Sequence, residues 1–203
     1  MNTATLKSYA PKARKDFLNS ITDKAALLGI TAKEQILANI TGDTAVINGR
    51  PYSTQIGKQQ IELVERVKKE GFQQVMEAIA YSWFNRFMAI RFMEIHDYLE
   101  HGYRVLSHPA GHDEPEILEK ATSIEFSGLN KQKVAELKLD GGKDEELYQL
   151  LLKAQCNELN KSMPFLFEHM ADCTELLMPE NLLHSDSVIR EMVNSIDEAD
   201  WQE

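Results

Sequence analysis

The segment of residues 72–99 constrains the fold more than any other part of the chain, because its apolar side chains follow helical spacing throughout. The residues of this stripe are Phe72, Val75, Met76, Ile79, Ala80, Trp83, Phe84, Phe87, Met88, Phe92, Ile95 and Leu99. A stripe this wide indicates a helix of roughly 40 Å that is buried over more than half of its circumference. Charged residues interrupt it every few positions, which excludes a membrane span.

Arg91 is the exception within this stripe, because it lies between Phe87 and Phe92 on the apolar side. An unpaired buried charge costs several kcal/mol, so the guanidinium must have a partner. A structural ion pair with a neighbouring carboxylate is the first expectation, and a contact to a phosphate or another subunit is the alternative. Arg86 in the same segment is the second candidate for a structural or interface contact.

The N-terminal segments combine helices with one hairpin. Pro11 is expected in the first turn of a helix that ends at Gly29, since a proline lacks the N–H that this turn leaves unused. Thr31 and Glu34 resemble a capping box that opens a short helix over residues 32–39.

Asn48-Gly49 predicts a β-hairpin between residues 45–47 and 50–52, because a type I′ turn needs two positive φ angles. Pro51 restricts the second arm to an edge position.

Further helices are predicted by periodicity, and residues 100–128 are expected to be irregular apart from a helical turn or two within 114–121. The helices are expected over residues 54–70, 72–99, 144–160, 164–177 and 185–196. The predicted fold class is therefore mainly α: a multi-helix, bundle-like domain with one long central helix and a small β-hairpin. We expect a single domain over residues 1–203, with a subdivision near residue 140 as the alternative.

Charge is unevenly distributed along the chain. The formal net charge is −10, yet residues 1–138 are close to neutral and the acidic excess lies in residues 139–203. A strongly acidic surface repels phosphate, so this last third is a poor DNA-binding surface and faces either solvent or a basic partner. With only two cysteines and no secretory signal, the chain is expected in the cytoplasm, with no membrane as partner.

Motifs of catalysis are missing from the sequence, which contains no G-x-G-x-x-G, Walker A, H-E-x-x-H or G-x-S-x-G pattern. Cys156 and Cys173 have no C-x-x-C partner and are expected to be buried, inert thiols. His108 and His112 are four residues apart, but Pro109 and Gly111 between them exclude the helical geometry that would align their rings. We therefore expect no catalytic, cofactor-binding or metal-ligating residue.

A resemblance to a known family rests on residues 80–109, AYSWFNRFMAIRFMEIHDYLEHGYRVLSHP. This segment resembles the N-terminal hallmark of the PglX family, the large adenine-specific DNA methyltransferases of BREX phage-resistance systems. LKSYAPKARKDFLNSITDKAALLGI near the start and IDEADWQE at the end resemble the same family, so the resemblance covers essentially the whole chain. WFNRFMAIRFME, residues 83–94, is its most specific part.

The resemblance implies a parent enzyme that transfers a methyl group from S-adenosylmethionine to the N6 of adenine. The family's F-x-G-x-G-type and N-P-P-Y-type motifs have no counterpart here, so no site residue can be carried over. The chain is then expected to be the N-terminal helical domain, truncated before the methyltransferase domain. Its implied partners are the rest of that chain, DNA through the full-length parent, other BREX components and a phage inhibitor.

Three functions follow as hypotheses. The first is a non-catalytic module that supports the catalytic domain or docks DNA or a partner. The second is an acidic protein-interaction domain that recruits another defence component or is bound by a phage antagonist. The third is a small helical protein with an enzymatic site around residues 101–114. The residues available for a limited DNA contact are Lys12, Arg14, Lys15, Arg50, Lys58, Arg66, Lys68 and Lys69.

Overall fold

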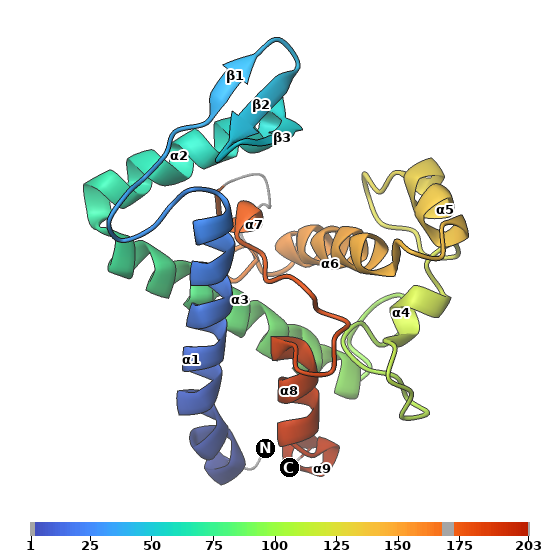
Figure 1. The fold of residues 1–203 in the computed structure, drawn as a ribbon. Coiled ribbons are helices and arrows are strands. Elements are labelled where there is room, and N and C mark those ends of the chain that lie inside the picture. The colour runs from blue at the N-terminus through green and yellow to red at the C-terminus, as the bar shows by residue number, and fades with distance from the viewer. Residues whose placement is uncertain (1–2, 168–172, 203) are drawn as a thin grey trace. The chain divides into compact units, whose positions relative to one another are not determined.

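The computed structural model describes residues 3–167 and 173–202 and confirms a mainly α fold with a small antiparallel sheet (Figure 1). The helices are α1 (Thr3–Leu27), α2 (Thr54–Glu70), α3 (Phe72–Ile95), α4 (Glu116–Glu119), α5 (Lys131–Leu139), α6 (Asp144–Asn160), α7 (Cys173–Leu176), α8 (Val188–Ser195) and α9 (Glu198–Gln202). The strands are β1 (Asn39–Thr41), β2 (Thr44–Ile47) and β3 (Arg50–Ser53).

The chain divides into two compact units. Unit 1 consists of Met1–Ala13, Phe84–His169 and Asn181–Glu203, and unit 2 of Arg14–Trp83 and Met170–Glu180. Helices α1 and α3 each contribute residues to both units. Residue 140, the alternative boundary considered from the sequence, lies inside unit 1. The single domain over 1–203 stays a prediction.

Helix α1 begins earlier than the sequence predicted, and Pro11 lies inside it rather than in its first turn. The prediction of its end is confirmed, because Gly29 has a φ of +71°. There the Ile30 N–H donates to the Ala25 carbonyl (2.9 Å) and the Gly29 N–H to the Ala26 carbonyl (3.0 Å). These two bonds make a Schellman motif, which satisfies carbonyls at the helix C-terminus.

The helix predicted over residues 32–39 is wrong. The Thr31 hydroxyl does accept from the Glu34 N–H (3.0 Å), as in a helix cap, but the Thr31 N–H also donates to the Glu34 carbonyl (2.8 Å). The two bonds close a loop that competes with the helix. Gln60 of α2 holds the loop from inside: its buried amide donates to the carbonyl of Ile36 and accepts from the N–H of Ala38.

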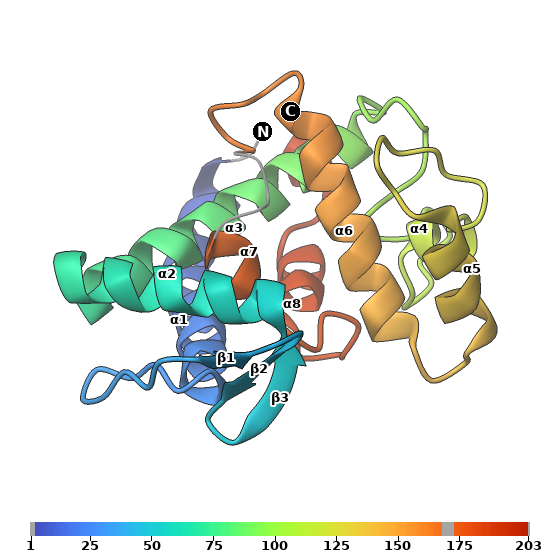
Figure 2. The same ribbon diagram turned by 90° about the horizontal axis from the view of Figure 1, so that it is seen from above.

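The predicted hairpin is confirmed as β2 and β3, with Asn48 and Gly49 both at positive φ. β1, which the sequence did not indicate, pairs antiparallel with β2 and completes a sheet of order β1-β2-β3, so Pro51 lies on an edge strand as expected. Helix α2 packs against this sheet (Figure 2). The contact is close at Gly57, where a built Cβ would lie 2.5 Å from the Ala45 Cβ.

Helix α3 is the predicted long helix, but it ends at Ile95 and not at Leu99. The Tyr98 N–H donates to the Met93 carbonyl (2.9 Å), and Asp97 takes the left-handed conformation with a φ of +54°. Glycine usually occupies such a position, so the sequence carried no stop signal there. In unit 2, the buried Trp83 of this helix donates from its indole N–H to the Thr174 carbonyl (3.0 Å).

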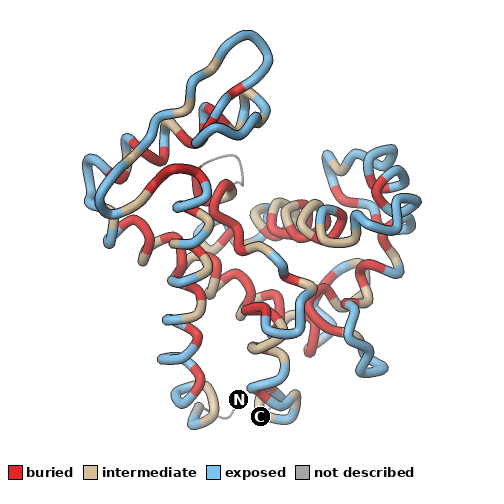
Figure 3. The backbone as a smooth tube through the Cα atoms, viewed as in Figure 1, coloured by how far each residue is buried: buried red, intermediate tan, exposed pale blue. Residues whose placement is uncertain are grey.

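In unit 1, the helical turn predicted within 114–121 is α4, and the helix predicted over 144–160 is α6. α4 and α5 both pack on α6, whose buried face is visible in Figure 3. The helix predicted over 185–196 is α8, which begins after its N-cap Ser187. The helix predicted over 164–177 lies partly outside the described residues. In the described part of this range, only α7 is helical. Helices α5 and α9 were not predicted.

Candidate functional site

Arg91 lies on the buried side of α3 in unit 1 and has three side-chain partners. One terminal nitrogen donates to Glu94 Oε1 (2.6 Å) and Ser107 Oγ (2.7 Å), and the other to Glu198 Oε1 (3.2 Å). Only 1% of Arg91 is exposed. Both terminal nitrogens are therefore bonded within unit 1, whereas the buried Nε has no hydrogen-bond partner. These contacts match the structural ion pair that was the first expectation.

Glu94 is the centre of this network. Its Oε2 accepts from the N–H groups of Val105 and Leu106 (both 2.7 Å), and its Oε1 accepts from Ser107 Oγ (2.9 Å) as well as from Arg91. Charge-assisted bonds of this kind compensate for the desolvation of a buried carboxylate. The pair therefore fixes the chain segment after α3 to the helix itself.

Glu198, in the first turn of α9, completes the network at its exposed edge. Both terminal nitrogens of Arg104 bind its carboxylate, and Arg91 shares one of the same oxygens. Burial alone would raise the pKa of Glu198, but the bonds and charges of Arg104 and Arg91 outweigh burial and hold this pKa below its usual value. Glu198 is therefore ionised at neutral pH and binds α9 to the end of α3.

Arg86 is buried in unit 1, with 3% of its surface exposed. Its charge influences Cys156: burial raises the pKa of that thiol to about 12, although the Arg86 guanidinium opposes the rise. The thiolate is the reactive form of cysteine, so Cys156 is not a nucleophile at neutral pH. Both cysteines are buried, as predicted.

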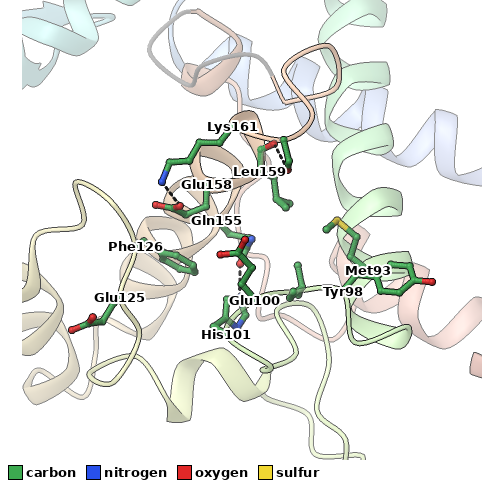
Figure 4. A pocket seen from close by; sticks show the side chains of 12 residues that line it. Met93, Tyr98, Glu100, His101, Glu125, Phe126, Gln155, Glu158, Leu159 and Lys161 are labelled. Atoms are coloured by element: carbon green, nitrogen blue, oxygen red, sulfur yellow. Dashed lines mark hydrogen bonds and ion pairs between the residues drawn. The ribbon is translucent and has the colours of Figure 1, made fainter.

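A pocket of about 290 Å³ opens in unit 1 between the end of α3, the segment before α5 and the end of α6 (Figure 4). Its lining residues are Met93, Tyr98, Leu99, Glu100, His101, Glu125, Phe126, Gln155, Glu158, Leu159, Lys161 and Ser162. His101 Nε2 lies 2.7 Å from Gln155 Oε1, and Phe126 meets the same ring edge-on. Glu158 is paired with Lys161. Four of the pocket's polar groups thus bind one another in two pairs, and neither pair is arranged as a nucleophile with a base.

His108, His112 and Glu119 form a second cluster in unit 1, which the sequence did not predict. Their ligand atoms lie within 4.8 Å of one another, and the two imidazole rings stack with centroids 4.1 Å apart. Among residues 3–167 and 173–202, no other group of three or more His, Cys, Asp or Glu side chains has this closeness. The histidines of the third hypothesis therefore do meet, whereas His101 belongs to the pocket described above.

Basic residues considered for DNA contact are partly used within the fold. Lys12 pairs with Glu191 in unit 1, and in unit 2 Arg14 lies 3.4 Å from Glu77. In the part of the chain that the structure describes, every helix is too short or too polar to cross a lipid bilayer.

Comparison with known proteins confirms the resemblance indicated by residues 80–109: over its whole length the chain is similar to a region of adenine-specific methyltransferases. The adenine-specific methyltransferase BrxX of Escherichia coli O9:H4 (strain HS) is 41% identical over 210 residues, covering 100% of this chain and 17% of BrxX. The adenine-specific methyltransferase PglX of Lacticaseibacillus casei (strain Zhang) is 32% identical over 221 residues, covering 99% of this chain and 18% of PglX. No protein-family profile matches the chain.

Proposed function

We propose that this chain is the N-terminal, non-catalytic helical module of a site-specific adenine-N6 DNA methyltransferase of a BREX anti-phage defence system. The observation that carries the proposal is the 41% identity to BrxX over the whole chain but only 17% of BrxX. The parent enzyme would use S-adenosylmethionine and DNA in the cytoplasm. The module would support the catalytic domain and dock DNA or a partner protein.

The site geometry is consistent with a supporting role. The Arg91–Glu94 pair is buried in unit 1, and Glu198 binds Arg91 from the exposed edge of the network. Adenine methyltransferases need an aromatic stacking surface and polar groups that hold the flipped base. Among the described residues, the pocket at His101 offers aromatic rings, but His101 is already bonded to Gln155 and Glu158 to Lys161.

A methyl-transfer assay tests the non-catalytic assignment. The 203-residue chain and the full-length parent are each incubated with labelled S-adenosylmethionine and an adenine-containing duplex. We expect transfer by the parent alone. Transfer by the purified 203-residue chain would overturn the assignment.

A deletion tests the supporting role separately. The parent lacking residues 1–203 is expected to lose most of its methylation at physiological salt. Full activity of this deletion variant would show that the module supports neither catalysis nor DNA binding, and would leave the resemblance itself untouched.

The acidic interaction domain is the second candidate, favoured by the charge of residues 139–203. Within each unit, however, cations from the first two thirds of the sequence neutralise part of this charge. The pairs are Lys12–Glu191, Lys24–Glu180, Arg91–Glu198, Arg104–Glu198 and Lys133–Glu146. Less charge is therefore left for a basic partner. A pull-down at low salt, where charge attraction is greatest, tests this function. Retention of a partner would support the interaction domain.

A further inference from the structure

A β-turn over residues 108–111 brings His108 and His112 together, next to Glu119. The Gly111 N–H donates to the His108 carbonyl (3.0 Å), which closes a β-turn with Pro109 at its second position. Proline is favoured there because its fixed φ suits the turn, and Gly111 follows with a φ of +73°. The two residues that exclude a helix thus bring His112 back onto His108, and their rings stack with an interplanar angle of 24°.

Glu119 reaches the same place from α4, which is fixed to the segment before His108. The Glu116 N–H donates to the Ser107 carbonyl (3.0 Å), and Glu116 Oε2 accepts from the Arg104 N–H (2.8 Å). Beyond His112, Arg190 holds Asp113 through both its carbonyl (2.8 Å) and its carboxylate (2.6 Å). Both ends of the turn are therefore anchored, so the backbone brings the three side chains near one another. Because an imidazole lone pair lies in the plane of its ring, His112 must turn out of its stack on His108 before both rings can bind one ion.

The distances suit a small cation. His108 Nε2 lies 3.3 Å and His112 Nδ1 lies 3.8 Å from Glu119 Oε1. Three ligand atoms around a tetrahedral zinc ion, with bonds of about 2.0–2.2 Å, lie roughly 3.3–3.5 Å apart. His112 is the most exposed of the three, at 60%, and can turn to close the remaining gap.

We propose that His108, His112 and Glu119 bind a divalent transition-metal ion, with zinc as the preferred ion. Two imidazoles and one carboxylate are the ligand set of open zinc sites, in which a fourth position holds water. The half-exposed Glu119 and His112 leave that fourth position accessible from solvent.

Two features of the cluster limit the affinity. The Ala110 N–H donates to His108 Nδ1 (3.0 Å), so the neutral ring carries its proton on Nε2, the atom that the metal needs. Binding shifts this proton to Nδ1 and breaks the bond from Ala110. Lys120 also lies near the second Glu119 oxygen (3.9 Å). We therefore expect a site weaker than a structural zinc site.

Metal titration of the 203-residue chain, prepared without an oligohistidine tag and stripped with a chelator, tests the site. Calorimetry with Zn²⁺ should show one saturable site, and Co²⁺ should give the visible absorption of a tetrahedral ion. His112→Ala and Glu119→Gln should each weaken binding by about tenfold or more. His184→Ala is the matched control, because His184 is an exposed histidine that pairs with Asp186 instead.

The proposal fails if neither metal binds saturably. It also fails if His112→Ala and Glu119→Gln bind as tightly as the unaltered chain, or if His184→Ala removes the site. Both test positions are exposed, and circular dichroism of each variant verifies that the fold is retained.

Discussion

Arg91 carries its charge into the buried part of unit 1, where Glu94 and Glu198 compensate the charge and Ser107 accepts one further hydrogen bond. A buried pair of this kind contributes little over two apolar residues, but removing one member leaves the other charge uncompensated. The conformation after α3 depends on it, because Glu94 also accepts the N–H groups of Val105 and Leu106.

Arg91→Ala should therefore lower the free energy of unfolding by about 3–5 kcal/mol, because it leaves the buried Glu94 without its cation. Urea denaturation followed by circular dichroism measures the effect. Arg14→Ala removes an arginine from an exposed pair with Glu77 and should change the free energy by less than about 1 kcal/mol. Equal effects of the two substitutions would contradict the assigned role of Arg91.

Glu198 makes stability depend on pH. Its pKa in the folded chain is held below the usual 4.5 by Arg104 and Arg91, against the effect of burial. A carboxylate with a lowered pKa contributes stability that is fully present above the unfolded value and is lost as pH falls through the folded value. Glu198→Gln should therefore lose less stability than the unaltered chain as the pH falls below the usual carboxyl pKa of 4.5. Identical pH profiles from urea midpoints would refute this.

At the scale of elements, the contact between α2 and the sheet depends on one missing side chain. Gly57 lies in the interior of α2, where alanine would ordinarily be favoured by about 0.5–1 kcal/mol. Here an added Cβ meets the Ala45 Cβ at 2.5 Å and Ile40 Cγ1 at 3.1 Å. The close approach of the helix to β1 and β2 reverses the usual preference.

Gly57→Ala is expected to destabilise the chain by about 1–3 kcal/mol, since the helix or the sheet must move to accept the methyl group. Gly141→Ala is the matched control, because no atom lies within 4 Å of the Cβ that it would add. Thermal unfolding by calorimetry compares the two. A Gly57→Ala variant that is more stable than the unaltered chain would contradict this, because it would mean that the sheet moves to accept the methyl group without loss of stability.

Elements whose signals are local could be predicted from the sequence, and those fixed by distant bonds could not. Asn48-Gly49 specifies its own turn, and the bounds of α6 follow from its periodicity. The loop over 32–39 depends on Gln60 of α2, and the meeting of His108 with Glu119 depends on bonds between α4 and the preceding segment. Neither dependence leaves a pattern in neighbouring residues.

At the scale of the molecule, each unit has its own buried thiol: Cys156 in unit 1 and Cys173 in unit 2. Neither should react with Ellman's reagent under native conditions, because both are inaccessible and burial raises the pKa of Cys156 to about 12. Both should react in denaturing urea. Leu139→Cys adds a thiol at a side chain that is 88% exposed and should react at once. Rapid native labelling of Cys156 would contradict its burial.

The two tryptophans are distributed in the same way. Trp83 is buried in unit 2 with its indole bonded to the Thr174 carbonyl, and Trp201 is buried in unit 1 at the end of α9. Each unit therefore carries its own fluorophore, shielded from water. If one tryptophan is replaced with phenylalanine, the fluorescence of the other reports on its own unit alone. Unfolding, ligand binding or partner docking can then be followed for each unit separately, without an added dye.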